Sequence, residues 1–144
     1  SGNENESSWR GRELELLDRL ASRPGESALV LADGVARIFR AGWALVLDAP
    51  VGGYSDVIAR GGAAPELDRV AVPWWPARPA RVLDVSEAWV PADWRHVGTE
   101  LAVAALGDIG LLVGRPALRW MPSELLRLAH LSAIAATVTG DGYP

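Results

Sequence analysis

The chain has 144 residues, of which 49% are hydrophobic and 22% charged, as in a single globular domain. Its formal net charge of −4 argues against nucleic acid and anionic membranes as partners, because phosphate contacts need clustered cations. The absence of cysteine excludes disulfides, thiolate metal ligands and cysteine nucleophiles.

The N-terminal segment begins with a polar stretch and continues as a helix. Residues 1–8 have the composition of a linker or tag remnant. Ser7 or Ser8 can cap a helix, and an apolar stripe then predicts an amphipathic helix as far as Ser22. The Pro-Gly pair at 24–25 ends this helix.

Three short apolar runs predict strands directly after the first helix. Residues 28–31 are apolar throughout, which predicts a central strand buried on both faces. Residues 35–40 and 43–47 are separated by Ala-Gly, which predicts a hairpin. The Asp-Gly pair at 33–34 provides the turn that precedes it.

The segment 49–79 is rich in glycine and proline, which predicts an irregular connection. Within it, residues 54–60 are expected to form a short helix, and residues 70–72 a strand-like run. Connections of this length inside a compact domain are usually functional or mobile.

The last third of the chain predicts a strand, a connection, two hairpin strands and a long helix, at residues 81–85, 88–94, 99–106, 109–113 and 122–138. The Gly-Asp pair at 107–108 lies between two apolar runs, as in a hairpin turn. Pro122 suits the first turn of a helix, where its missing N–H is not needed. Sequential hairpins predict an antiparallel sheet with helices mainly on one face, an α+β fold.

Three motifs of this last third resemble GAF domains. Thr99–Val103 and Gly110–Val113 stand where the family has its two central hairpin strands, and Pro122–Leu125 stands where its last helix starts. The resemblance implies a GAF-like (PAS-related) central antiparallel sheet of about five to six strands, with N- and C-terminal helices packed on one face. PAS domains share such a sheet, and the helix at each end of this chain favours GAF. Met121 stands where the family more often has a capping Ser or Thr, which predicts a weak helix start.

The resemblance also implies a domain organisation and a role. We expect a linker or tag remnant at 1–8, a single GAF-like domain at 9–139 and a C-terminal tail at 140–144. The implied type is the regulatory domain of actinobacterial signalling proteins. Such a domain is non-catalytic and cytoplasmic and acts beside other domains of a longer signalling protein. In the family, the segment that corresponds to 49–79 forms much of the wall or lid of the ligand pocket.

The cofactors of well-defined GAF subclasses do not fit these residues, so we expect none. The cyclic-nucleotide signature of the family needs a lysine and bilin attachment needs a cysteine, and the chain has neither. Haem needs an axial histidine, for which His96 is a better candidate than His130 because it lies near the tryptophans. Two histidines without paired spacing do not make a transition-metal site, and no serine lies in a nucleophile elbow. We therefore also expect no metal and no enzyme activity.

Tryptophan is unusually frequent in this chain, with seven copies. Four of them lie within 74–94. They either fill a core that has only one phenylalanine and one methionine, or line a pocket for a flat or cationic ligand. The pair at 74–75 stands between prolines, and its two side chains cannot both point inward if the backbone is extended. The candidate ligand-binding residues are Trp74, Trp75, Trp89, Trp94 and His96.

The last predicted helix is apolar almost all round, so more than its sheet-facing side should be covered. The N-terminal helix can cover the second side, or the helix can pack across a two-fold axis in a homodimer, as GAF domains commonly do. The candidate dimer residues are Leu17, Leu126, Ile134 and Val138. Two functions follow: a sensory module that binds a small molecule and controls a signalling or transcription output, or a pure interaction and dimerisation module without a ligand.

Overall fold

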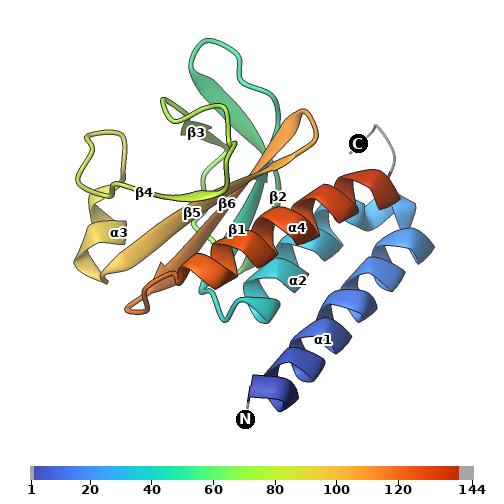
Figure 1. Cartoon of the computed structure of the whole chain (residues 1–144). Helices are drawn as coiled ribbons and strands as arrows, with labels where there is room; N and C mark the ends of the chain where they lie inside the picture. The colour runs from blue at the N-terminus through green and yellow to red at the C-terminus, as the bar shows by residue number, and fades with distance from the viewer. Residues whose placement is uncertain (1, 140–144) are drawn as a thin grey trace.

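The computed structural model of the chain describes residues 2–139, with side chains from residue 10 onward except those of residues 24 and 96. Helical segments open the chain, four strands and a short helix follow, and a hairpin and a helix close it (Figure 1). In chain order the elements are α1 (Gly2–Ser22), η1 (Pro24–Glu26), α2 (Ser27–Ile38), β1 (Trp43–Leu47), β2 (Tyr54–Gly62), β3 (Arg69–Ala71), β4 (Arg81–Leu83), α3 (Ala92–His96), β5 (Thr99–Leu106), β6 (Ile109–Pro116) and α4 (Pro122–Val138).

The strands form one six-stranded antiparallel sheet in the order β3-β2-β1-β6-β5-β4. The long hairpin β5–β6 and strand β1 make its centre, where Trp43 lies opposite Gly114 and Leu101 opposite the same glycine on the other side. The two edge strands, β3 and β4, have only three residues each. The expectation of a GAF-like antiparallel sheet with helices on one face is confirmed.

The helices cover one face of the sheet (Figure 1). Helix α2 lies against β1 and β2, α4 lies against β5, and α1 packs across α2 and α4 from outside. Alternating strand residues such as Ala44, Val46, Ala102 and Ala104 point into this layer and form its core with α2 and α4. The second side of α4 is therefore covered by the N-terminal helix, one of the two arrangements that the sequence left open.

Helix α2 contradicts the strands expected at 28–31 and 35–40. All but three of its twelve residues are buried, and these three, Leu29, Asp33 and Arg37, recur every four residues, so the helical period shows only as a narrow exposed stripe. The Asp-Gly pair at 33–34 is inside the helix and makes no turn. Gly34 is needed there for packing, because a Cβ atom would lie 2.4 Å from the Leu16 Cδ1 atom of α1.

Strand β2 contradicts the short helix expected at 54–60. It pairs with β1 in a hairpin, and the turn uses Gly52 and Gly53, whose φ angles of 61° and 84° favour glycine. Near its end, a Cβ atom at Gly61 would lie 2.2 Å from the backbone carbon of Ala32. Helix α2 therefore lies directly on the β2 backbone, which fixes the distance between helix layer and sheet.

The remaining expectations agree with the structure in part. Strands β1, β4, β5 and β6 lie at the runs expected as strands, although β4 ends at Leu83 and β6 runs on to Pro116, and α4 has the expected bounds. The hairpin partner of β1 is β2, and not the run 35–40. Helix α1 starts at Gly2, earlier than the cap at Ser7 or Ser8 implies, and so reaches into the segment 1–8. Part of the connection expected at 88–94 forms α3. The tail at 140–144 lies outside the described residues.

Candidate functional site

The sheet face opposite the helices carries a tryptophan cluster. We call the five residues of this cluster and the loops that hold them the tryptophan face. The rings are in contact at centroid distances of 4.8 Å for Trp43–Trp94, 6.5 Å for Trp94–Trp89, 6.3 Å for Trp89–Trp74 and 5.8 Å for Trp74–Trp75. They pack with Leu45, Leu101 and Leu112 of the central strands in a second hydrophobic core.

The candidate tryptophans fall into two groups by exposure. Trp74 and Trp94 are buried, whereas Trp75 and Trp89 are half-buried and reach the surface. The adjacent pair is thus split between interior and surface, and Trp74 lies in a turn that is closed by a hydrogen bond from the Trp75 N–H to the Val72 carbonyl at 3.0 Å. The structure brings all four together: Trp74 and Trp94 form a buried base, and Trp75 and Trp89 form a rim at the surface.

Two arginines hold the loops of the tryptophan face through backbone carbonyls. Arg81 donates hydrogen bonds to the carbonyls of Trp74, Pro76 and Pro79, the last two at 3.2 and 3.1 Å. Arg95 donates to the carbonyls of Val85, Glu87 and Val90, at 2.8, 3.1 and 2.7 Å. Because an arginine has five donors in a rigid fork, one side chain can fix a whole loop.

The turn after β4 adds a further fixed point. The Asp84 carboxylate accepts hydrogen bonds from the Ser86 hydroxyl at 2.6 Å and from the Ser86 backbone N–H at 2.9 Å. These bonds favour the charged form and lower the pKa of Asp84 from its ordinary value, the hydroxyl contributing most. The loop that carries Trp89 therefore starts from a hydrogen-bonded Asx turn.

Two buried polar groups of this region have no hydrogen-bond partner among the described residues. They are the indole Nε1 of Trp74 and the hydroxyl of Ser55, which lies on β2 beside β3. A buried donor without a partner costs about 1–3 kcal/mol, so such groups call for an explanation. Each can donate to a polar group of a small molecule that enters the tryptophan face.

The histidines lie apart. His96 is the last residue of α3, two positions after Trp94, so its backbone is near the cluster; its side chain is outside the described part. His130 is exposed on α4, on the opposite side of the sheet. In the described part of the chain, no three His, Asp or Glu side chains gather as a metal site would require. Among residues 2–139 there is no helix with the length and apolarity needed to cross a membrane.

The candidate dimer residues differ in exposure. Leu126 is 74% exposed on α4, and Val138 is exposed at the end of that helix. Ile134 is half-buried, and Leu17 of α1 packs against the core of the helix layer. The exposed part of the set therefore lies on α4.

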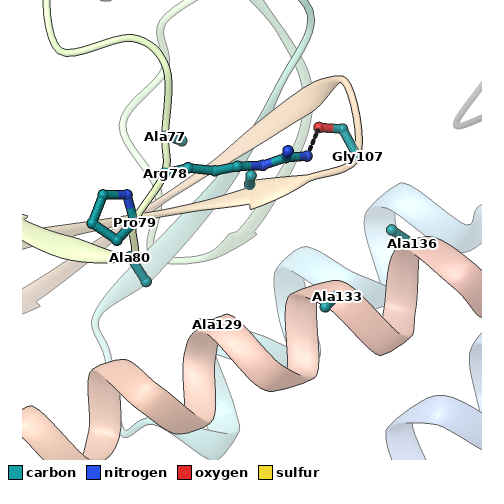
Figure 2. A pocket seen from close by; sticks show the side chains of 9 residues that line it. Ala77, Arg78, Pro79, Ala80, Gly107, Ala129, Ala133 and Ala136 are labelled. Atoms are coloured by element: carbon teal, nitrogen blue, oxygen red, sulfur yellow. Dashed lines mark hydrogen bonds between the residues drawn. The ribbon is translucent and has the colours of Figure 1, made fainter.

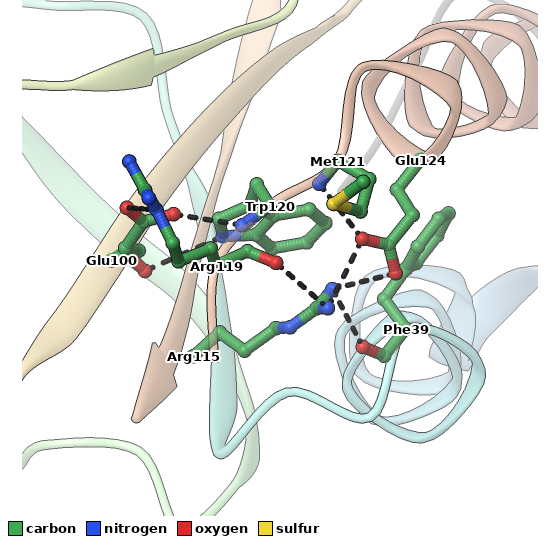
Figure 3. A network of polar contacts seen from close by, with 7 residues as sticks. All are labelled: Phe39, Glu100, Arg115, Arg119, Trp120, Met121 and Glu124. Carbon is green, nitrogen blue, oxygen red and sulfur yellow. Dashed lines mark hydrogen bonds and ion pairs between the residues drawn. The ribbon is translucent and has the colours of Figure 1, made fainter. Parts of the chain in front are cut away.

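A buried arginine joins β6, α2 and α4 (Figure 3). Arg115 makes a bidentate ion pair with Glu124 at 2.8 and 3.0 Å and donates to the carbonyls of Phe39 and Arg119. The Glu124 carboxylate also accepts the backbone N–H of Met121 at 2.9 Å. The carboxylate thus provides half of a capping box, so the start of α4 is not weak despite Met121 at the cap.

A groove that the sequence analysis missed lies between α4 and the segment 77–80 (Figure 2). It has a volume of about 430 Å³. Arg78 reaches from this segment to the β5–β6 turn and donates a hydrogen bond to the Gly107 carbonyl at 2.9 Å. We call it the alanine groove, because six of its lining residues are alanines: Ala77, Ala80, Ala105, Ala129, Ala133 and Ala136.

Comparison with known proteins identifies the fold. No protein-family model matches the sequence, and a search of curated proteins finds no match.

Solved structures do match. The second GAF domain of DevS from Mycobacterium smegmatis is 16% identical, with a TM-score of 0.58 over 81% of this chain and 92% of that one. The GAF domain of an Acinetobacter phosphoenolpyruvate-protein phosphotransferase is 13% identical, with a TM-score of 0.61 over 88% and 91%. The A. aeolicus nlh2 GAF domain, in an inactive state, is 10% identical, with a TM-score of 0.62 over 92% and 96%. The chain therefore has the fold of GAF domains.

Proposed function

We propose that this chain is a sensory module that binds a small molecule on the tryptophan face, and that binding changes how its end helices, α1 and α4, pack. The observation that carries this proposal is the combination of two half-buried tryptophans, Trp75 and Trp89, with two buried donors, Trp74 Nε1 and the Ser55 hydroxyl, on one face. Aromatic walls with a few polar groups are the usual composition of a small-molecule site. One structural neighbour, from a cyanobacterial phytochrome, is a phycocyanobilin-bound GAF domain.

The proposed lining is Trp74, Trp75, Trp89, Trp94 and His96. The two rim tryptophans would contact the ligand with their ring faces, which favours a flat or cationic molecule. The loops fixed by Arg81 and Arg95 would hold these rings in place before binding, which lowers the entropy cost of association. Covalent bilin attachment through a thioether has no cysteine to use.

The first experiment is native mass spectrometry of the purified chain, followed by binding measurements on Trp89→Ala. Because Trp89 is half-buried, this variant should fold and lose the ligand. Tyr54→Ala, which removes an exposed aromatic ring outside the cluster, is the matched control and should bind normally. Undiminished binding by Trp89→Ala would place the ligand elsewhere.

Trp94 needs a milder substitution. It is buried against Trp43, so Trp94→Ala should lower the free energy of unfolding by about 3–5 kcal/mol, which would obscure any effect on binding. Trp94→Phe keeps an aromatic ring and tests whether the indole itself matters. Loss of ligand by a stably folded Trp94→Phe would support its place in the lining.

The second candidate function is an interaction module without a ligand, which dimerises through Leu17, Leu126, Ile134 and Val138. The observation behind it is that Leu126, 74% exposed, and Val138, 38% exposed, are apolar side chains on α4 that such an interface would cover. Leu126→Arg should then convert dimers to monomers in analytical ultracentrifugation, whereas Val51→Arg, at an exposed apolar residue of the β1–β2 turn, should not. Dimers that withstand Leu126→Arg would remove this residue from the interface.

We further propose the setting of the module. It would be a non-catalytic, actinobacterial-type regulatory domain spanning residues 9–139 of a longer cytoplasmic signalling protein, with other domains of that protein as partners. Ligand binding would matter only if the two packings of the end helices differ in affinity for the ligand. Measuring the ligand affinity of the isolated chain and of the longer protein would test that coupling.

A further inference from the structure

The alanine groove lies along α4, between that helix and the segment 77–80 (Figure 2). Two of its lining residues, Ala77 and Ala105, also pack in the core beneath the tryptophan face. Its volume of about 430 Å³ falls in the range of small-molecule sites. It forms because β4 begins only at Arg81. In the β4–β5 register Arg81 lies opposite Val103, so continued pairing would place Pro79 opposite Ala105. Pro79 has no N–H to donate, and the chain departs from β5 there.

Small side chains keep the groove open. Ala129, Ala133 and Ala136 follow one another along one side of α4 at helical spacing, and Ala77 and Ala80 stand on the opposite wall. A side chain that ends at Cβ cannot reach across, so nothing from either wall fills the space. The walls are apolar and offer dispersion contacts to a hydrocarbon chain.

Arg78 provides the only charge among the residues that line this groove. Its Nη2 group donates to the Gly107 carbonyl, and no ion pair joins it to any residue of the described part of the chain. An arginine has five N–H donors, so most of this guanidinium remains available. The natural partner of that planar group is a carboxylate, which it binds through two parallel hydrogen bonds.

A second hollow of about 320 Å³ adjoins the first, since it shares Ala77, Arg78, Ala105 and Gly107 with it, and it is also lined by Trp75 of the tryptophan face. Asp108 lines this second hollow and is the carboxylate of the chain that could compete for Arg78. The alanine groove itself contains no acidic residue, so a ligand that enters there meets no repulsion.

We propose that the alanine groove binds a small monocarboxylic acid, with its apolar tail between α4 and the segment 77–80 and its carboxylate on Arg78. The site lies beside the tryptophan face but is lined by none of its tryptophans, and it goes beyond the function proposed above. A ligand bound there contacts α4 directly.

The test is a titration of the ¹⁵N-labelled full chain with octanoate and with octanamide, its uncharged analogue, followed by NMR. Octanoate should bind with a Kd of roughly 1 mM or tighter and shift the amide signals of Gly107, Ala129 and Ala133. Octanamide should bind about ten-fold or more weakly, because a hydrogen bond to a charged group is worth about 1.5–3 kcal/mol. Absence of binding at 10 mM (roughly −2.7 kcal/mol) would overturn the proposal.

Two variants separate the charge from the cavity. Arg78→Gln should reduce octanoate affinity to that of octanamide, and Ala133→Leu, which places a larger side chain in the groove, should abolish binding of both probes. Both sites are exposed, so the fold should persist. The matched controls are Arg119→Gln and Ala21→Leu, exposed residues outside the groove, and they should bind like the parent chain.

The remaining outcomes are also decisive. Octanoate binding that is equal in Arg78→Gln and the parent would overturn the role of the guanidinium. Shifts confined to the tryptophan face, or binding lost in Trp89→Ala but kept in Ala133→Leu, would assign octanoate to the other face and overturn the groove. Binding kept in Trp89→Ala and lost in Ala133→Leu would support the groove whatever becomes of the sensory proposal.

Discussion

The ring of Trp75 lies directly on Gly110, in the space that a side chain at that position would occupy. A Cβ atom there would be 2.7 Å from Cζ3 and 3.0 Å from Cη2 of the indole. The Trp75 ring therefore packs directly against the backbone of β6 at Gly110, which has no side chain to displace it. The glycine is part of the Gly110–Val113 motif that resembles GAF domains.

Gly110→Ala should push the Trp75 ring off β6. Because this side chain is half-buried, it can move, and the loss of stability should be about 1–3 kcal/mol, as for moderate overpacking. Urea unfolding measures the loss, and the indole N–H signal of Trp75 in an NMR spectrum reports the displacement. An unchanged signal would mean that the ring does not rest on Gly110 in solution.

Gly61→Ala should be more harmful than Gly110→Ala. Its Cβ atom would meet the backbone of Ala32 at 2.2 Å, and a helix backbone cannot rotate away as a side chain can. We expect a loss larger than 3 kcal/mol, beyond the usual cost of overpacking. Gly11→Ala is the control, because no atom lies within 4 Å of its added Cβ and α1 should gain about 0.5–1 kcal/mol. If Gly61→Ala were as stable as Gly11→Ala, the close contact of α2 and β2 would be contradicted.

Glu124→Ala should destabilise the chain by roughly 3–5 kcal/mol, because it leaves a buried guanidinium without its counter-charge. The side chains of Arg115 and Glu124 are only 5% and 22% exposed. Glu26→Ala removes an exposed carboxylate 4.0 Å from Arg23 and should cost less than about 1 kcal/mol. Thermal and urea unfolding of both variants provide the comparison. A small effect of Glu124→Ala would mean that water replaces the carboxylate.

Glu13→Gln should stabilise the chain near neutral pH. Burial raises the pKa of Glu13 above its ordinary value, against the lowering effect of His130, Arg127 and Arg10. The folded state therefore binds the proton more readily than the unfolded state. Stability from this group is present below the unfolded pKa and is lost as the pH rises through the folded pKa. A Tm advantage of Glu13→Gln at pH 7 should thus shrink in acid.

The control for this prediction is Glu15→Gln, which makes the same substitution at an exposed position of α1. A lower Tm of Glu13→Gln at pH 7 would show that attraction to the neighbouring cations outweighs the cost of burial.

The C-terminal half of the fold could be predicted because its signals are local. The Gly-Asp pair at 107–108 marks the hairpin, and Pro122 marks the start of α4. Helix α2 could not be predicted in this way, because it is buried nearly all round. It also contains Gly34, whose small size leaves room for the Leu16 side chain of α1, a contact between residues distant in sequence. Strand β2 was missed although Gly52-Gly53 is a hairpin signal, because no clear alternation follows it.

The candidate site, too, could be predicted only where its signals are local in the sequence. The high tryptophan content of the sequence marks these residues as candidates. The structure gathers Trp74, Trp75, Trp89 and Trp94 on one face. Which of them reaches the surface depends on contacts such as Trp75 on Gly110, which sequence spacing does not show. The alanine groove gives no local signal of this kind, since its walls come from three separate segments, 77–80, 105–107 and 129–136, and consist mostly of alanine, a common residue.

The contacts from Trp43 through Trp94, Trp89 and Trp74 to Trp75 have a spectroscopic consequence. Each neighbouring pair of rings lies within 6.5 Å, so the electronic transitions of the five indoles are coupled. Excitation absorbed by one ring can pass along the series from the centre of the sheet to its rim. The circular dichroism of the strong far-ultraviolet indole band should then contain a contribution from the coupled rings, and a rotation of Trp75 alone would alter it. The chain carries an unlabelled optical reporter for any molecule that settles on that face.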